Sequence, residues 1–148
     1  MEIRTMTDEQ RRALPIEYLK RLDRGQDVVD LFDEDALLYF PKWGFARGHK
    51  EIARLFSDLM GILENVSHDV IYPNIIQQGD MVVVESTTFG RTKSGVEWRA
   101  GVSHAGRWCD VFEIRNFKIQ RLSIYLDPDY EGADTKRYPW LATNSQPR

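Results

Sequence analysis

The chain shows two kinds of hydrophobic periodicity, and the first is helical. Between residues 49 and 63, apolar side chains recur at the i, i+3, i+4 and i+7 spacing of an amphipathic helix; they are Ile52, Leu55, Phe56, Leu59, Met60 and Leu63. A second stripe predicts an earlier helix and is formed by Leu14, Tyr18 and Leu22. This helix would begin with Thr7 as its N-cap and end at Gly25. Pro15 lies within it, and we expect a kink or a second start there.

The second kind of periodicity is the alternation of strands, and it dominates after residue 65. Strands are predicted at residues 67–77, 81–91, 96–114 and 119–126, and one earlier strand at 36–40. Residues 42–48 are predicted to be a loop, and residues 115–118 a turn between the last two strands. Gly101 and Gly106 indicate bulges or strong bending. Helices followed by such strands predict an α+β domain, in which a bent sheet wraps around helices and leaves a conical hollow.

Length and composition fit a single globular domain. The chain has 148 residues, and we expect a core at about 5–130 with a tail at 131–148. The net charge of −3 offers no electrostatic footprint for nucleic acid or an anionic membrane. The N-terminus does not resemble a signal peptide, and no apolar run approaches the ~20 residues that span a bilayer. Cys109 is the only cysteine, which suggests a reducing compartment, and we expect a cytoplasmic protein.

Asp110 is an acid on a strand face that is otherwise apolar. Side chains that alternate with period two place four residues on this face: Trp108, Asp110, Phe112 and Ile114. An acid in such surroundings needs a partner or a function. We expect the face to line a pocket in which Asp110 works, and the alternative is a salt bridge to Arg99 or Arg107. Cys109 and Val111 fall on the opposite face, where apolar groups suit the interface of a homodimer or homotrimer.

Three further polar residues are candidates for chemistry. His68 opens a predicted strand, and imidazole is the side chain that exchanges protons most readily near neutral pH. Tyr18 could stabilise an enolate through its hydroxyl, and Asp23 could assist it. Each has an ordinary alternative: a solvent-exposed histidine, a core tyrosine and a solvated helix end. An aromatic wall for a planar substrate, or else plain core, is predicted from Tyr39, Trp43, Trp108, Phe112 and Tyr125.

Several other kinds of site are not indicated by the sequence. The three histidines, His49, His68 and His104, do not fall at the spacing of metal ligands. The sequence contains neither a glycine-rich phosphate loop nor a GxSxG elbow. We therefore expect chemistry on a small-molecule substrate without a metal or cofactor.

Taken together, these features resemble the nuclear transport factor two-like superfamily, and within it the SnoaL-like and scytalone-dehydratase-like branch. The resemblance covers about residues 5–130. It rests on the order of elements and on four stretches: YLKRLDRG, ALLYFPKWGFARGHKEI, NVSHDV and DVFEI followed by KIQRLSIYLDP. It implies a cone-shaped α+β barrel, also called a cystatin-like roll, with N-terminal helices on a strongly bent antiparallel or mixed sheet.

The resemblance also implies roles for individual residues. Tyr18 matches a pocket tyrosine of ketosteroid isomerases and related dehydratases, and Asp110 matches a pocket carboxylic acid of the isomerases. His68 matches a catalytic histidine of scytalone-dehydratase-like enzymes, and Asp23 an acid of several dehydratases. The general base of the isomerases is replaced by Phe40. The second histidine of scytalone dehydratase has no clear match, and Arg91 or Lys93 lies near its position.

The sequence supports one leading hypothesis and two alternatives. The first is a cofactor-independent lyase in which His68 removes a proton, assisted by Asp110, Tyr18 and Asp23. Its substrate would be a small hydroxylated aromatic or polyketide-like molecule, and either water or a small aldehyde would leave, as in superfamily lyases of aromatic catabolism. The alternatives are a non-catalytic domain that binds a small molecule and an isomerase of the ketosteroid type.

Overall fold

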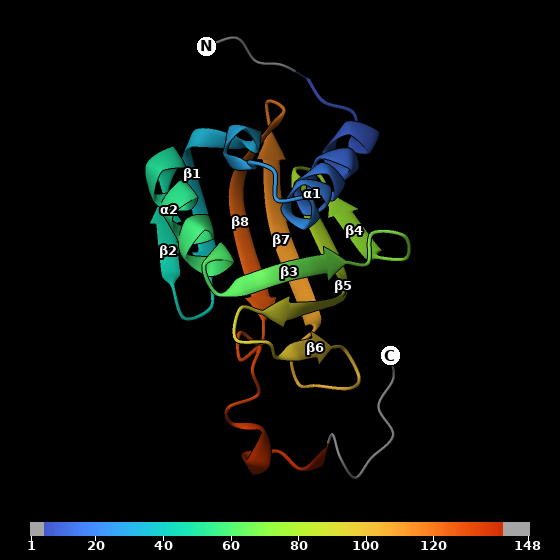
Figure 1. Ribbon diagram of the computed structural model, residues 1–148. Helices are drawn as coiled ribbons and strands as arrows, with labels where there is room; N and C mark the ends of the chain where they lie inside the picture. Colours follow the sequence, from blue (N-terminus) through green and yellow to red (C-terminus); the bar gives the residue numbers. More distant parts are fainter. Residues whose placement is uncertain (1–4, 141–148) are drawn as a thin grey trace.

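Two helices lie against one face of a large mixed sheet (Figure 1). The computed structural model describes residues 5–140. The helices are α1 (Asp8–Asp23) and α2 (Gly48–Met60). The strands are β1 (Phe32–Phe40), β2 (Gly44–Arg47), β3 (Leu63–His68), β4 (Asn74–Gln78), β5 (Met81–Thr92), β6 (Glu97–Arg99), β7 (Arg107–Arg115) and β8 (Lys118–Leu126). Short 3₁₀ turns cover Val29–Leu31 and Thr135–Arg137. The predicted α+β class is confirmed.

The sheet has the order β2-β1-β8-β7-β5-β3, with β4 and β6 also paired to β5. All of these pairs are antiparallel except β1 with β8, which is parallel. The first half of β5 pairs with β7, whereas its second half pairs with β3 and β6. This long strand therefore bends the sheet and carries β3 away from the plane of β7 and β8 (Figure 1). The hollow between the sheet and the helices is the predicted cone.

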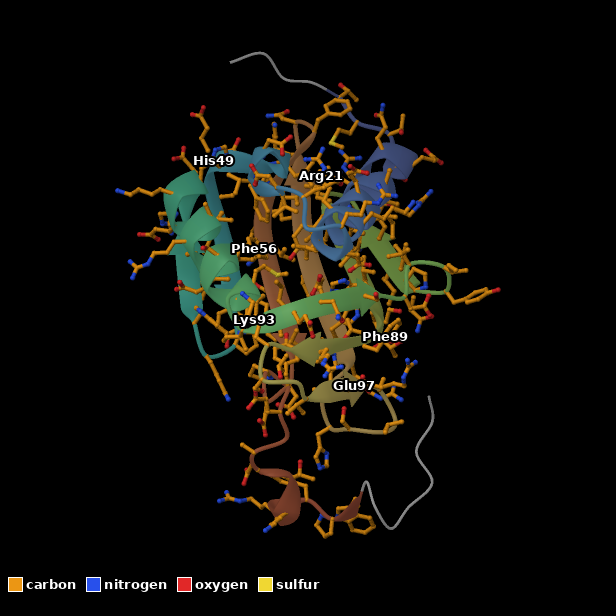
Figure 2. The ribbon with its side chains drawn as sticks, viewed as in Figure 1. Arg21, His49, Phe56, Phe89, Lys93 and Glu97 are labelled. Carbon is orange, nitrogen blue, oxygen red and sulfur yellow. The ribbon has the colours of Figure 1, made fainter. Side chains whose placement is uncertain are left out.

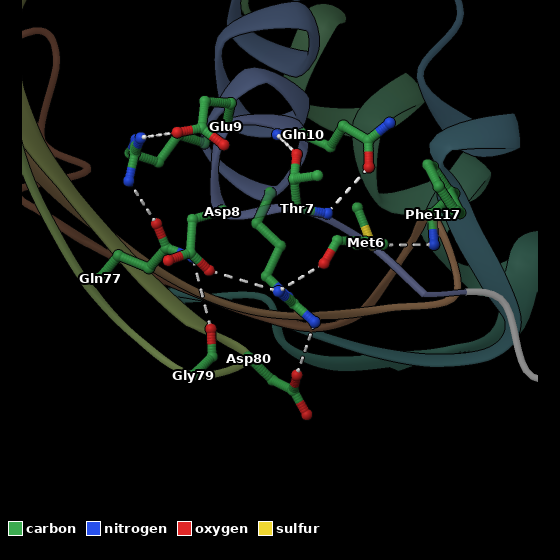
Figure 3. A network of polar contacts seen from close by, with 11 residues as sticks. Met6, Thr7, Asp8, Glu9, Gln10, Gln77, Gly79, Asp80 and Phe117 are labelled. Carbon is green, nitrogen blue, oxygen red and sulfur yellow. Dashed lines mark hydrogen bonds and ion pairs between the residues drawn. The ribbon is translucent and has the colours of Figure 1, made fainter.

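Helix α1 begins with the predicted capping box. The Gln10 amide donates to Thr7 Oγ1 at 3.2 Å, and the Thr7 amide donates to Gln10 Oε1 at 2.9 Å (Figure 3). Beside it, Gln77 bonds to Asp8 at 3.1 Å and thereby ties the helix to the end of β4. Pro15 does not start a second helix, because α1 runs without interruption from Asp8 to Asp23. The proline ring is buried. Gly25 ends the segment with a φ of 67°, as expected for a helix C-terminus.

Several of the predicted boundaries are wrong. Leu63, expected in the second helix, begins β3, and β1 begins at Phe32 rather than at residue 36. The segment expected as strand 67–77 is two strands, since a turn around Asp69 and Pro73 separates β3 from β4. The segment expected as strand 96–114 breaks at Gly101 and Gly106, which have φ angles of 80° and 118°. A Cβ at Gly106 would collide with the Ala100 backbone. The two backbone segments therefore approach so closely that only glycine fits at position 106. The predicted loop at 42–48 contains β2, which pairs with β1.

Replacement of Gly90 by Ala is expected to destabilise the protein. A Cβ at this position in β5 would lie 2.5 Å from the Asn65 carbonyl oxygen and would overlap the Trp98 ring. Overpacking of this kind costs about 1–3 kcal/mol. Urea unfolding followed by fluorescence measures the change in the free energy of unfolding. A loss below about 0.5 kcal/mol would mean that Trp98 does not pack on Gly90 in solution.

No helix within residues 5–140 is both long enough and apolar enough to cross a membrane.

Candidate active site

An internal cavity occupies the hollow between the helices and the sheet. The volume of this cavity that water-sized molecules can reach is about 40 Å³. Its apolar wall comes from α1, α2, β1, β3 and β8 and consists of Leu22, Phe40, Phe56, Leu59, Met60, Leu63, Val66, Ile124 and Leu126. Phe56, labelled in Figure 2, projects from α2 towards the sheet. The wall also contains five residues with polar atoms: Tyr18, His68, Trp108, Asp110 and Tyr130. Such a mixture is typical of a ligand site.

His68 ends β3 and is fixed by the carboxylate at the end of α1. Asp23 Oδ1 lies 2.5 Å from His68 Nδ1, and Asp23 Oδ2 accepts the His68 backbone N–H at 2.9 Å. A carboxylate is only an acceptor, so Nδ1 carries a proton, and in the neutral imidazole the lone pair lies on Nε2. The imidazole also packs edge-on against Trp108, with ring centroids 5.5 Å apart. These contacts orient the ring and leave Nε2 as the atom able to take up a proton.

Asp110 is buried in the cavity wall without a charged partner. Its side chain lies on β7 and the residue is 3% exposed. No ion pair or side-chain hydrogen bond joins it to any residue between positions 5 and 140, so the alternative of a salt bridge to Arg99 or Arg107 is wrong. Burial disfavours the charged form and raises the pKa of the Asp110 carboxyl well above its ordinary value. Burial therefore favours the neutral carboxylic acid, which can donate a hydrogen bond into the cavity.

Tyr18 brings a phenol into the same cavity from α1. Its ring contacts Phe112 edge-on at 5.7 Å between centroids, and Phe32 and Phe56 at 6.1 Å each. Burial raises the pKa of Tyr18 well above its ordinary value, and the nearby Asp110 and Tyr130 raise it further. The phenol is thus neutral, and the aromatic contacts fix the direction of its hydroxyl.

The indole of Trp108 adds an unsatisfied donor. Its Nε1 is buried and has no hydrogen-bond partner within the described part of the chain. Buried donors without partners are rare in native proteins, and such a donor commonly marks a ligand or water site. The cavity therefore contains more hydrogen-bonding capacity than the protein itself satisfies.

The structure brings together all four residues that were proposed as catalytic. His68, Asp110 and Tyr18 line one cavity, and Asp23 reaches it through His68. Tyr130 is an additional wall residue that the sequence analysis did not include among the candidates. Its place among the polar residues follows from the path of the chain after β8, which sequence patterns do not indicate.

Of the five residues expected to bind substrate, the structure places only Trp108 in the cavity wall. Tyr39 and Tyr125 contact each other on the opposite face of the sheet, with ring centroids 6.0 Å apart. Strand alternation explains this, because Leu38 and Phe40 face inward and Tyr39 must face outward. Phe112 lies beneath the Tyr18 ring rather than in the wall. Trp43 packs edge-on against Phe40, outside the cavity.

The described residues of the cavity wall do not provide a set of metal ligands. Among residues 5–140, no group of three histidine, cysteine, aspartate or glutamate side chains is arranged to hold a metal ion. Asp23 and His68 already bond to each other. The polar atoms that remain are better suited to an organic ligand that accepts and donates hydrogen bonds.

The sequence of the chain also matches a family model. The model of the SnoaL-like domain matches residues 17–122, which is more than half of the chain. The chain belongs to the SnoaL-like family. The resemblance predicted from its sequence stretches is thereby confirmed. A search of curated proteins finds no significant match for this SnoaL-like protein.

Solved structures support the fold of this SnoaL-like protein. An NTF2-like protein from Anabaena variabilis superposes with a TM-score of 0.68 at 17% identity, covering 88% of this chain and 98% of that chain. TerC co-crystallised with polyporic acid has a TM-score of 0.65 at 16% identity, with coverages of 91% and 99%. A protein assigned as a polyketide cyclase from Xanthomonas campestris pv. campestris has a TM-score of 0.68 at 15% identity, with coverages of 80% and 91%. At these identities the likeness concerns the fold alone.

Proposed function

We propose that this SnoaL-like protein is a cofactor-independent lyase that removes a proton next to a substrate carbonyl. The observation that carries the proposal is the Asp23–His68 pair in the wall of the cavity that also holds the unpaired, neutral Asp110. A base and a neutral acid in one site are the two groups that enolisation requires.

His68 is the base in this proposal. Its Nε2 takes the proton from the carbon next to the carbonyl, and the positive charge that develops on the ring is stabilised by Asp23 across the Nδ1 hydrogen bond. Tyr18 and Asp110 donate hydrogen bonds to the carbonyl oxygen as it becomes an enolate. Both are neutral because of burial, so both retain the protons that such donation needs.

Two outcomes can follow from the enolate chemistry. In elimination, the electron pair of the enolate expels the β-hydroxyl group, which takes the proton that His68 has accepted and leaves as water. In the retro-aldol variant, His68 takes the proton of the β-hydroxyl, the bond between the α and β carbons breaks, and an aldehyde leaves. The resulting enolate then recovers a proton on carbon. Elimination is the simpler proposal, because the α-proton alone has to reach His68.

The cavity wall also supports a substrate class. It contains no lysine or arginine among the described residues that line it, and an anionic substrate would lose its hydration there without a counter-ion. Its small volume favours one ring over several. The substrate is therefore an uncharged hydroxylated aromatic or polyketide-like ketone. The cyclase description of the Xanthomonas protein is in line with a polyketide-like substrate in this fold.

Isomerisation of the ketosteroid type is less well supported. Phe40 lies in the cavity wall at the position expected for the isomerase base, and a phenyl ring cannot move a proton. His68 approaches from β3 instead, on the other side of the helix-covered hollow.

The experiment uses 3-hydroxy-1-phenylbutan-1-one, an uncharged single-ring ketone with a β-hydroxyl group. Elimination converts it to 1-phenylbut-2-en-1-one, and retro-aldol cleavage converts it to acetophenone and acetaldehyde, so chromatography separates the two reactions. We expect the unsaturated ketone to form faster than in an equimolar imidazole solution. An unchanged ketone that nevertheless binds to the protein would reject the lyase and identify a binding domain.

Replacement of Asp23 by Asn should lower kcat for this ketone roughly 10- to 100-fold with little change in KM, because it weakens the hold on the His68 tautomer. Steady-state kinetics measure both constants. Asp69→Asn is the matched control, since Asp69 follows His68 directly but its carboxylate accepts hydrogen bonds only from the Ile71 and Tyr72 amides among the described residues. If kcat fell equally in Asp23→Asn and Asp69→Asn, Asp23 would have only a structural role.

A further inference from the structure

Tyr130 lines the cavity but lies outside the segment that the family model matches. It follows β8 by four residues and lies beyond residues 17–122, which the SnoaL-like family model matches. Its side chain nevertheless forms part of the same cavity wall as Tyr18, His68 and Asp110. The family assignment therefore says nothing about this tyrosine, and its role must be inferred from its contacts.

The Tyr130 ring is held by Trp98 of β6. The two ring centroids lie 4.7 Å apart at an interplanar angle of 54°. Trp98 is itself fixed, because its Nε1 donates to Thr88 Oγ1 at 3.1 Å and its ring covers Gly90, where no side chain intervenes. A ring held in this way loses little conformational freedom when a ligand binds.

The backbone around Tyr130 is fixed as well. Asp129 accepts the amide of Ala133 at 3.0 Å and the amide of Asp134 at 3.1 Å, and Asp127 accepts the amide of Asp129 at 2.9 Å. These backbone donors, Asp134 first and then Ala133, hold the pKa of the Asp129 carboxyl below its ordinary value. The turn that presents Tyr130 is thus stabilised by its own carboxylates.

The Tyr130 side chain lines the same cavity as the Asp110 side chain. Burial raises the pKa of Tyr130 above its ordinary value, and the Asp110 carboxyl raises it further to the extent that it ionises. Tyr130 in turn raises the pKa of Tyr18, so the three groups form one cluster. Within residues 5–140, the Tyr130 hydroxyl has no hydrogen-bond partner. A neutral phenol without a protein partner is a donor that a ligand oxygen can use.

We propose that Tyr130 is a third hydrogen-bond donor to the substrate oxygen that Tyr18 and Asp110 bind, and that the segment after β8 supplies it. This inference rests on the proposed function for the identity of that oxygen. It adds a substrate-binding residue that determines affinity for a carbonyl or phenolic oxygen, and it makes the segment after β8 part of the active site.

Binding of two matched probes, 4-fluorophenol and 4-fluorotoluene, tests the inference by fluorine NMR. The probes differ only in a hydroxyl that replaces a methyl group. We expect Tyr130→Phe to weaken the binding of 4-fluorophenol about three- to tenfold, since one hydrogen bond is removed. The affinity for 4-fluorotoluene should not change, because the ring of residue 130 is kept. Tyr138→Phe is the control, because Tyr138 follows in the same segment but lies outside this cavity.

Three results would overturn the inference: equal weakening of both probes, no change in either, or no binding of 4-fluorophenol to the unaltered protein. Failure of the proposed function is seen separately, as an unchanged hydroxy ketone in the turnover assay. If the protein binds 4-fluorophenol through Tyr130 but does not convert the ketone, the role of Tyr130 as a donor is supported and the proposed lyase activity is rejected.

Discussion

Replacement of His68 by Gln is expected to reduce turnover of 3-hydroxy-1-phenylbutan-1-one by about 10²- to 10⁴-fold, the usual contribution of a general base. Glutamine keeps a polar side chain of similar reach, and its amide can still bond to Asp23. It has no nitrogen that can accept the α-proton, so binding survives and the chemical step is lost. Initial rates at saturating ketone measure this effect.

His104→Gln is the matched control for this experiment. His104 contacts the Tyr138 ring and lies outside the cavity, so its replacement removes an imidazole without touching the site. We also expect added imidazole to restore part of the activity of His68→Gln and none of any loss in His104→Gln. Turnover by His68→Gln within threefold of the unaltered protein would exclude His68 as the base.

Replacement of Asp110 by Leu is expected to lower the same turnover by about 10²- to 10³-fold, because it removes one donor to the enolate oxygen. The same change is expected to stabilise the fold by about 1–3 kcal/mol at pH 7, because a buried polar group without a partner is costly. Asp110→Asn separates the two effects, since its amide can still donate a hydrogen bond. We expect its rate to lie between those of Asp110→Leu and the unaltered protein.

The stability gain of Asp110→Leu should depend on pH with a defined sign. The pKa of Asp110 is higher in the folded protein than in the unfolded chain, so the folded state binds more protons at intermediate pH. The part of the cost of Asp110 that comes from its ionisation is therefore absent below the unfolded pKa and grows as pH rises towards the folded pKa. Urea unfolding at several pH values should show the gain increasing with pH from acid to neutral. A gain that is constant with pH, or a loss of stability, would contradict a neutral buried acid.

The sequence predicted the inner face of β7 because its alternation is regular. Trp108, Asp110 and Phe112 all face inward, and Cys109 and Val111 are less buried on the opposite face. The pairing between strands could not be predicted in the same way. Tyr125 lies opposite Cys109 in the sheet and so shares its outward face. An aromatic side chain alone does not indicate which face it occupies, which is why Tyr125 was expected in the cavity.

The contact between Asp23 and His68 illustrates a second limit of sequence analysis. Family resemblance indicated both residues, but they are 45 positions apart, and only the packing of α1 against β3 brings them together. The contribution of Tyr130 was missed for a related reason. A tyrosine in a polar stretch after the last strand is typical of a surface anchor, and its position beside Asp110 depends on the stacking with Trp98.

The most direct test of the central claim is proton exchange in acetophenone, an uncharged ring ketone that has α-protons and no leaving group. The protein is incubated with acetophenone in D₂O, and the loss of the methyl signal is followed by proton NMR. If His68 removes α-protons while Tyr18 and Asp110 bind the oxygen, deuterium enters the methyl group well above the rate in equimolar imidazole. In His68→Gln, exchange then returns to that rate. Exchange by the unaltered protein at the imidazole rate would contradict the account.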